Sequence, residues 1–420
     1  MRTWLALLLL LWSGLAAAQE PSPELRARIG ELAGVLRGQG DPAALFTPAF
    51  LAQVPAAQVR AIATQLAGQY GAIRGQARIT PVSASAARMD FEFERATVHM
   101  NVSLDPAAPH LINGWFITGA EMTGDSFDAV IAEVSALPGT TGFAVARLGD
   151  GAPAMLASIG PDRPLAIGSA FKLFILAELQ RQIGAGRRHW SDVVTLDLRS
   201  IPSGVLQTWP RGAPVTLHTL AAQMISISDN TAADTLLHVL GRENVEAMMA
   251  TLGVEAAARD RPLLSTLEMA ALKTGPAAAL DAWRAADEAG RRRQLAALDA
   301  TADPARIDIS RFSGNPLGLD VEWYASAADL VRTMDWLRRH GDASAHGILA
   351  INSGLGPVAN GFAYVGYKGG SEPGVLNLSW LVRTRAGVWH VVIGSWNNPA
   401  APLDEARFIG LMARAVQLLR

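Results

Sequence analysis

Along the first hundred residues, the spacing of hydrophobic positions changes from helical to strand-like. Apolar residues recur every three or four positions over residues 25–36 and again over residues 59–66, which is typical of helices with one buried face. From Met89 the period is two, and apolar residues alternate with polar ones through Leu104. Such alternation predicts antiparallel strands buried on one side. With a further strand-like run on either side, residues 19–119 are predicted to form a small α+β domain of helices followed by a four-strand antiparallel meander.

A second domain is predicted after a stretch rich in Gly, Thr and Ser. We expect a linker at residues 120–126, because a new helical pattern starts at Phe127. Residues 127–420 then hold a helix, two strand-like runs, a long helical middle, a late strand block and a final helix. This order predicts an α+β domain in which an antiparallel sheet, built from strands near both ends of the segment, packs against a helical region.

The N-terminus has the pattern of an export signal. Arg2 is followed by an apolar run and then by small residues at Ala16 and Ala18, so residues 1–18 are predicted to be a cleaved signal peptide. The run is too short to span a bilayer core of about 30 Å. Because the chain contains no cysteine, we expect no cysteine-linked lipid anchor and no other membrane anchor. A secreted or periplasmic protein follows as the expectation.

Composition limits the partners that the protein is expected to have. Roughly 400 residues after cleavage favour two domains over one core, and 50% hydrophobic residues support a fully folded chain. A formal net charge of −2 gives no basic field for nucleic acid. The absence of cysteine also removes disulfides and thiolate metal sites. We expect a small-molecule substrate, with no metal, no cofactor and no obligatory protein partner.

The segment GSAFKLFIL contains a candidate nucleophile and its base. Ser169 starts a helical pattern and Lys172 lies three residues on, so the two side chains share one helix face with Cβ atoms about 5–6 Å apart. A serine hydroxyl needs a base, and a lysine is a base only when neutral. Burial, nearby positive charge and a helix N-terminus all lower a lysine pKa. The alternative is an ordinary amphipathic helix with Ser169 as N-cap and Lys172 in solvent.

The use of lysine in this chain favours the catalytic interpretation. Of 36 basic residues only three are lysines, namely Lys172, Lys273 and Lys368. Arginine occupies all the other basic positions, most of which are expected to need only a positive charge at the surface. The remaining lysines are therefore candidates for work that arginine cannot perform, such as giving up and regaining a proton.

Two later segments carry further candidate residues. MISISDNTAADTLL has Ser228 and Asn230 at the start of a helical pattern, where a simple helix cap is the alternative. YKGGSEPGVLNL has Lys368, Gly370 and Ser371 leading into a strand, where a glycine-rich edge strand is the alternative. Each segment alone has an ordinary explanation.

In this order, the three segments resemble the SxxK, SDN and KTG motifs of class A β-lactamases and penicillin-binding proteins. The resemblance covers roughly residues 122–420 and implies a β-lactamase-like fold. It implies that Ser169 attacks a carbonyl, with Lys172 as its base directly or through water. Ser228 would relay a proton to the leaving nitrogen, and Lys368 would supply positive charge beside Ser228 and a substrate carboxylate.

The same resemblance implies a set of substrate-binding residues. Asn230 would hydrogen-bond a substrate amide, and Gly370 would let the strand backbone approach the acyl group. The backbone N–H groups of Ser169 and Ser371 would form the oxyanion hole.

The third motif departs from the family pattern. A literal K-T-G occurs at residues 273–275, but Ser265 and Glu268 have the spacing of a capping box, and Gly275 with Pro276 is typical of a helix end. We therefore assign the motif to Lys368. There Gly369 replaces the usual hydroxyl residue, for which the hydroxyl of Ser371 is the candidate substitute.

The deacylation machinery departs as well. Class A enzymes carry a glutamate in an E-x-x-L-N loop, and this chain has no such string. Glu322 is the weak candidate for that role, with a solvated residue before a helix as the alternative. The long segment between Asn230 and Trp323 is expected to have rebuilt the loop.

Three functions remain open from the sequence. The leading hypothesis is an exported serine hydrolase that is acylated by β-lactam or related substrates. The second is a D,D-peptidase or esterase using the same serine, and the third is a non-catalytic penicillin-recognising binding protein. An α+β domain in front of a β-lactamase-like domain resembles the domain order of the β-lactamase-like protein of clavulanic acid biosynthesis and its exported relatives. We expect the front domain to be a scaffold, with a binding module as the alternative.

Overall fold

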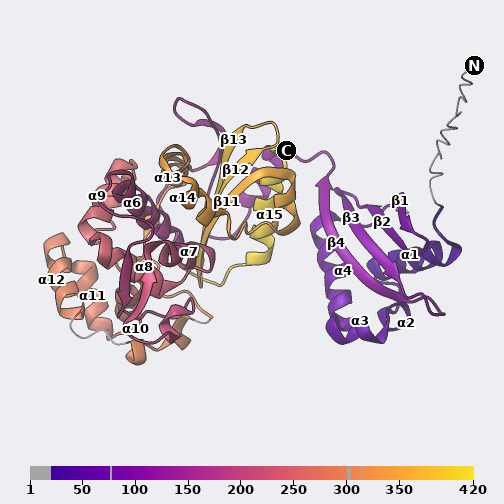
Figure 1. The fold of residues 1–420 in the computed structure, drawn as a ribbon, viewed down its shortest axis with the longest axis horizontal. Helices are drawn as coiled ribbons and strands as arrows, with labels where there is room; N and C mark the ends of the chain where they lie inside the picture. The colour runs from indigo at the N-terminus through magenta and orange to yellow at the C-terminus, as the bar shows by residue number, and fades with distance from the viewer. Residues whose placement is uncertain (1–19, 76–77, 300–303, 313) are drawn as a thin grey trace, which may run out of the picture. The chain divides into compact units, whose positions relative to one another are not determined.

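The computed structural model describes residues 20–75, 78–299, 304–312 and 314–420. The predicted signal peptide, residues 1–18, lies outside the described residues. The chain divides after Gly124 into two compact units (Figure 1), each with its own core. None of the helices in the described ranges has the length and hydrophobicity needed to cross a membrane.

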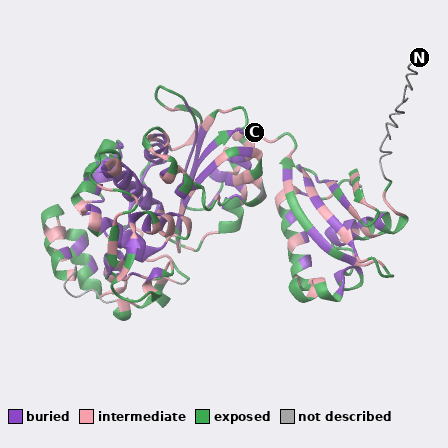
Figure 2. Cartoon of the chain, in the orientation of Figure 1, coloured by how far each residue is buried: buried purple, intermediate pink, exposed green. Residues whose placement is uncertain are grey.

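The first unit contains the predicted helices and meander. Its elements are α1 (Pro23–Leu36), α2 (Pro42–Leu45), α3 (Pro48–Gln53), α4 (Ala56–Tyr70), β1 (Arg78–Ser83), β2 (Ala86–Glu92), β3 (Ala96–Leu104) and β4 (Ile112–Met122). The strands form one antiparallel sheet in the order β1-β2-β3-β4. Every second residue of β3 is buried, because one sheet face packs on the helices while the other meets solvent (Figure 2).

The last strand of this unit is longer than the sequence indicated. The sequence predicts a linker from residue 120, yet β4 continues to Met122, which pairs with Ala96 of β3. Cross-strand pairing with β3 holds this polar end in the sheet, although its composition is that of a loop. The next helix, α5 (Phe127–Ser135), begins where the sequence predicted it.

The second unit is built on a five-stranded antiparallel sheet. Its strands are β5 (Thr140–Leu148), β6 (Ala154–Ile159), β11 (Phe362–Glu372), β12 (Val375–Thr384) and β13 (Trp389–Asn397). Their order is β11-β12-β13-β5-β6, so strands from both ends of the segment are neighbours, as predicted. Both faces are buried: α5 and α15 (Glu405–Gln417) pack on one face and the helical region packs on the other.

The helical region lies between β6 and β11 in the sequence. Its α-helices are α6 (Lys172–Gly184), α7 (Leu217–Ser226), α8 (Asn230–Leu240), α9 (Arg242–Thr251), α10 (Thr266–Thr274), α11 (Ala277–Ala285), α12 (Glu288–Asp299), α13 (Ala327–His340) and α14 (Ala343–Ala350). Two small strand pairs join β7 (Leu165–Ala166) to β10 (Tyr324–Ala325) and β8 (Val193–Leu196) to β9 (Ala213–Thr216). The 3-10 turns are η1 (Gly168–Phe171), η2 (Leu206–Thr208), η3 (Glu255–Ala258), η4 (Pro304–Arg306), η5 (Ile309–Phe312) and η6 (Gly356–Gly361).

A buried ion pair fixes the start of the second unit to its last helix. Arg414 of α15 donates two hydrogen bonds of 2.9 Å to Asp125 and one of 2.7 Å to Glu133. The side chains of Arg414 and Asp125 are 8% and 2% exposed. A pair this well shielded is costly to break, because the remaining charge stays out of water.

Replacing Asp125 by Asn is expected to lower the free energy of unfolding by about 3 kcal/mol, since Arg414 loses a buried carboxylate. The matched control is Asp281→Asn, because Arg284 likewise keeps a second carboxylate, that of Asp320. Asp281 is 69% exposed, so its loss should cost less than about 1 kcal/mol. Denaturant unfolding measures both, and equal losses would contradict the role of the buried pair.

Candidate active site

Ser169 lies in a 3-10 turn that leads into α6. The sequence predicted a continuous helix, but η1 covers Gly168–Phe171 and the α-helix begins at Lys172. In a 3-10 turn, side chains three residues apart are eclipsed, so Ser169 and Lys172 still share a face. The turn packs against a distant segment of the chain, because Trp323 stacks on Phe171 with ring centroids 3.8 Å apart.

The backbone of β11 approaches η1 more closely than a side chain would permit. A Cβ on Gly370 would lie 2.1 Å from the carbonyl oxygen of Ile167 and 2.5 Å from the backbone nitrogen of Ser169. On the other side of this contact, Gly168 has φ +49° and faces the backbone nitrogen of Ser371. Glycine at 370 is therefore required by contact. The two N–H groups assigned to the oxyanion hole lie in these two adjoining segments.

Lys172 is completely buried and surrounded by acceptors from the second motif. Its Nζ donates to the carbonyl oxygen of Ser228 at 2.7 Å, to Ser228 Oγ at 3.1 Å and to Asn230 Oδ1 at 2.7 Å. Burial lowers the pKa of Lys172 to about 7, although Asp234 and Asp229 act to raise it. A substantial fraction of the amine is therefore neutral near neutral pH.

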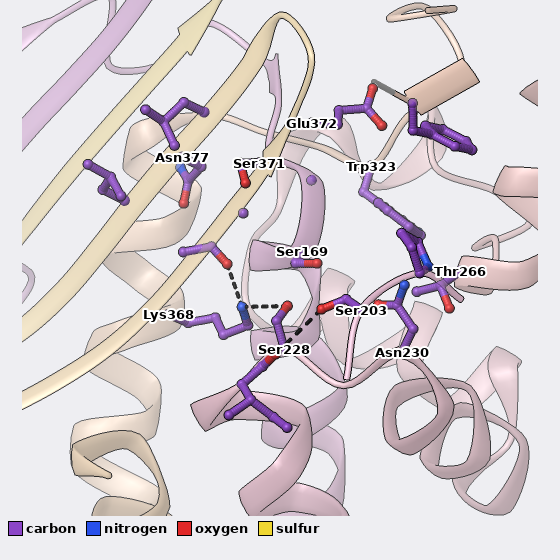
Figure 3. Close-up of a pocket in the computed structure, with 18 of the residues that line it drawn as sticks. Ser169, Ser203, Ser228, Asn230, Thr266, Trp323, Lys368, Ser371, Glu372 and Asn377 are labelled. Carbon is purple, nitrogen blue, oxygen red and sulfur yellow. Dashed lines mark hydrogen bonds between the residues drawn. The ribbon is translucent and has the colours of Figure 1, made fainter. Parts of the chain in front are cut away.

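Lys368 reaches the same hydroxyl from the third motif. Its Nζ donates to Ser228 Oγ at 3.1 Å and to the carbonyl oxygen of Gly369. Burial, and the charge of Lys172, lower the pKa of Lys368 well below its usual value. Ser228 Oγ thus lies between two lysine amines. Figure 3 shows Ser169, Ser228 and Lys368 together at the centre of the pocket.

The second motif acts both as a helix cap and as part of the site. Asp229 is the N-cap of α8, and it also accepts hydrogen bonds from the backbone of Val205 and Leu206. Ser228 has a positive φ of 59°, which turns it away from the helix and toward Lys172. Asn230 donates through Nδ2 to the carbonyl oxygen of Ile201. The cap interpretation and the catalytic interpretation therefore describe the same residues.

These residues line a pocket of about 520 Å³, a volume suited to a small molecule. Ser169, Ser228, Asn230, Lys368, Gly370 and Ser371 all line it, so the pocket gathers every predicted site residue except Lys172, which is buried behind it. Ser371 is exposed, which leaves its hydroxyl open to a ligand. Gly369 supplies no hydroxyl, as the sequence indicated.

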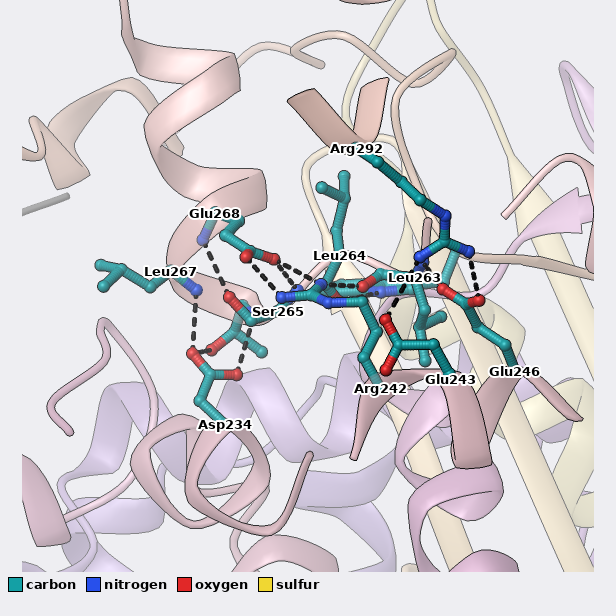
Figure 4. A network of polar contacts seen from close by, with 12 residues as sticks. Asp234, Arg242, Glu243, Glu246, Leu263, Leu264, Ser265, Leu267, Glu268 and Arg292 are labelled. Carbon is teal, nitrogen blue, oxygen red and sulfur yellow. Dashed lines mark hydrogen bonds and ion pairs between the residues drawn. The ribbon is translucent and has the colours of Figure 1, made fainter. Parts of the chain in front are cut away.

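The opposite wall of the pocket comes from α10, which a polar network holds in position (Figure 4). Asp234 of α8 accepts hydrogen bonds from the backbone of Thr266 and Leu267 and from the Thr266 hydroxyl. The capping box of Ser265 and Glu268 is present as predicted. Burial raises the pKa of Asp234. Thr266 lines the pocket at a place that no motif indicated.

The literal K-T-G at residues 273–275 ends α10, as expected, but its lysine is not a simple helix-end charge. Lys273 is 1% exposed and forms ion pairs with Glu322 and Glu372. Burial alone would lower the pKa of Lys273, but the two glutamates raise it above its ordinary value. All three lysines of the chain are therefore buried.

The solvated interpretation of Glu322 is wrong, and the catalytic one gains no support. The side chain is fully buried, so it is not solvated, and it lies against Lys273. It is also not among the residues that line the pocket around Ser169. Glu372 and Trp323, which no sequence motif indicated, do line that pocket. A polar residue after the glycines of the third motif and an aromatic residue beside Glu322 were the available signals.

Comparison with known proteins agrees with this architecture. Residues 125–311 match the model of the β-lactamase enzyme family. The second unit resembles a β-lactamase from Sphaerobacter thermophilus, with 22% identity and a TM-score of 0.50 over 70% of this chain and 96% of that one. The penicillin-binding protein PBP-A aligns with 19% identity and a TM-score of 0.48 over 70% of this chain and 94% of its own. Among curated proteins, none matches the chain.

The family match falls on the segment that carries two of the three motifs, and the fold match extends over a share of the chain as large as the second unit. The resemblance predicted from the motifs is thereby confirmed, and the second unit of this chain has a β-lactamase-like fold and follows a separate α+β unit.

Proposed function

We propose that this protein is a serine hydrolase in which β-lactam or related amide substrates acylate Ser169. The observation that carries the proposal is the hydrogen-bonded chain from Lys172 through Ser228 to Lys368 beside the serine. A cluster of two buried amines and a hydroxyl has no evident structural purpose, because burying amines costs free energy. Export of the enzyme remains a prediction that rests on residues 1–18.

Acylation requires one proton to leave the serine and one to reach the leaving group. Neutral Lys172 accepts the proton of Ser169 as the serine oxygen bonds to the carbonyl carbon. When the C–N bond breaks, Ser228 gives its proton to the leaving nitrogen and is reprotonated by Lys172. The 3.1 Å contact between Lys172 and Ser228 Oγ provides that return path. Lys368, on the other side of Ser228, binds in its protonated form an anionic group of the substrate, and the anion favours that form by raising the lowered pKa of Lys368.

The negative charge of the tetrahedral intermediate needs preorganised donors. The backbone N–H groups of Ser169 and Ser371 are our assignment for this role, because Gly370 and Gly168 allow their segments to touch. Donors fixed before the reaction need no reorganisation when charge develops, which makes them effective.

Hydrolysis of the acyl-enzyme has weaker support than its formation. Glu322 is held by Lys273 away from the pocket lining. The carboxylates that line the pocket among the described residues are Glu372 and Glu405, and Glu372 is itself paired with Lys273. We therefore expect slow deacylation. This favours a D,D-peptidase-like or esterase activity as the second candidate function.

Labelling with a fluorescent penicillin and turnover of nitrocefin test the proposal together. Labelling of Ser169 that persists for minutes, with slow nitrocefin hydrolysis, is the expected result. The Ser169→Ala variant should lose both signals. If the intact protein is neither labelled nor active toward nitrocefin, a binding protein or an esterase of other specificity replaces our proposal.

The rate of acylation is expected to rise with pH and to level off above about 7, because burial lowers the pKa of Lys172 to about 7 and only the neutral amine is a base. Stopped-flow labelling across the pH range measures the profile. In Lys172→Arg the side chain stays charged, so the rate should fall by roughly 10²–10⁴-fold. A flat profile in the intact protein would exclude Lys172 as the base.

Gly370→Ala is expected to reduce acylation by about 10²-fold, because its methyl group would displace the Ser169 N–H from the oxyanion position. Gly347→Ala is the control, since a Cβ there meets nothing within 4 Å. Acylation rates and thermal melting of both variants provide the measurement. Unchanged acylation in folded Gly370→Ala would refute the assigned oxyanion hole.

A further inference from the structure

Strand β11 presents an amine and a carboxyl group on one face. The ladder with β12 is regular from Lys368 to Glu372, so Lys368, Gly370 and Glu372 lie on the same side of the strand. Gly370 faces the backbone of Ser169. At the usual rise of a strand, the Cα atoms of Lys368 and Glu372 are about 13 Å apart. An amine and a carboxyl group therefore lie on either side of Ser169.

Glu372 is the member of a buried acidic cluster that reaches the pocket. The cluster consists of Glu322, Lys273 and Glu372, and Lys273 donates to Glu372 Oε1 at 2.6 Å. The side chains of Glu322 and Lys273 are fully buried, whereas that of Glu372 is 11% exposed and lines the pocket. Figure 3 shows Glu372 on the Trp323 side, with Ser169 between it and Lys368.

The cluster contains more acid than base. Two carboxyl groups meet one ammonium, so the cluster has one surplus negative charge when fully ionised. Glu322 Oε2 is buried and has no hydrogen-bond partner within the described part of the chain. An unsatisfied buried carboxylate oxygen is costly, which indicates that the cluster takes up a proton. Glu322 does not line the pocket, so Glu372 is the carboxyl group of the cluster that a cation in the pocket could reach.

We propose that Glu372 forms a subsite for an ammonium group on the acyl side chain of the substrate, with the substrate's anionic group held near Lys368. This inference rests on the proposed function, because it assumes that the reacting carbonyl lies at Ser169. It extends that function by naming a substrate class: bipolar molecules whose cation and anion lie on opposite sides of the carbonyl.

Protonation of Glu372 gives this subsite a distinctive signature. Burial, and the nearby Glu322 carboxylate, raise the pKa of Glu372 well above its usual value, although Lys273 acts to lower it. The charged groups that face or share its surroundings are Lys273 from α10, Glu322 from the segment before β10, and Glu405 of α15 in the same pocket. An ammonium that binds to a protonated Glu372 must displace its proton.

Ampicillin and benzylpenicillin provide a matched pair of probes, because they differ by one amino group on the acyl side chain. The Ser169→Ala protein prevents acylation, so calorimetry measures reversible binding. We expect ampicillin to bind roughly tenfold more tightly than benzylpenicillin, the range of a charge-assisted hydrogen bond. Only ampicillin should release a proton, detected as binding heat that changes with the ionisation enthalpy of the buffer.

Variants locate the preference on Glu372. Glu372→Gln in the same background keeps an acceptor for Lys273 and should bring the two affinities within about twofold of each other. Glu372→Asp should retain part of the preference if the Gln variant folds poorly. Glu405→Gln removes the same charge from another wall, and the ampicillin preference should survive it.

The preference for ampicillin should also rise with pH through the raised pKa of Glu372 and fall again where the ampicillin amine loses its proton, since only the ionised carboxylate pairs with an ammonium. Equal affinities for the two penicillins, or a preference that disappears in Glu405→Gln and not in Glu372→Gln, would overturn the subsite. Acylation of Ser169 in the intact protein is measured as an independent test of the proposed function. A protein that binds ampicillin selectively but is never acylated would refute the proposed function and leave the subsite standing.

Discussion

The contact between the backbone of β11 and the 3-10 turn η1 is the constraint on which the site depends. Gly370 has no side chain, so the strand can lie against the backbone of Ile167 and Ser169 at distances that any Cβ would prevent. This contact joins the sheet to the helical region at Ser169, the proposed nucleophile. Ser169, the N–H of Ser371 and the amine of Lys368 come together because these two backbones touch.

Burial of amines is the second organising feature. Lys172 and Lys368 both hydrogen-bond Ser228 Oγ at 3.1 Å, and burial lowers the pKa of each. Lys273 is buried too, but two glutamates keep it charged and raise its pKa. The surroundings therefore shift the pKa of the same residue type in opposite directions. Two hydrogen-bonded glutamates keep Lys273 charged, whereas burial outweighs the more weakly acting Asp229 and Asp234 at Lys172.

The helical middle shapes the pocket wall through capping and polar networks. Asp234 accepts hydrogen bonds from the backbone of the first turn of α10, and the capping box of Ser265 and Glu268 defines where that helix begins. The helix therefore presents Thr266 to the pocket and Lys273 to the acidic cluster. Helix α10, whose end carries the literal K-T-G of residues 273–275, thus forms one wall of the pocket.

The sequence by itself determined the two-unit organisation, the order of helices and strands, and the identity of the motif residues. Periodicity and capping are local properties, so Phe127, Ser265 and the final helix could be predicted correctly from neighbours in the chain. The scarcity of lysine pointed to Lys172, Lys273 and Lys368 alike, but composition did not distinguish the ion-paired Lys273 from the two lysines beside Ser228.

Only the tertiary structure decided what depends on contacts between distant segments. Glu322 and Lys273 are 49 residues apart, and nothing near either residue indicates that they form a buried pair. Met122 was predicted to lie in a loop from its composition, yet pairing with Ala96 keeps it in the sheet. Ser169 lies in a 3-10 turn that is packed between Trp323 and Gly370. Packing and electrostatics across the fold are long-range, and local sequence patterns do not encode them.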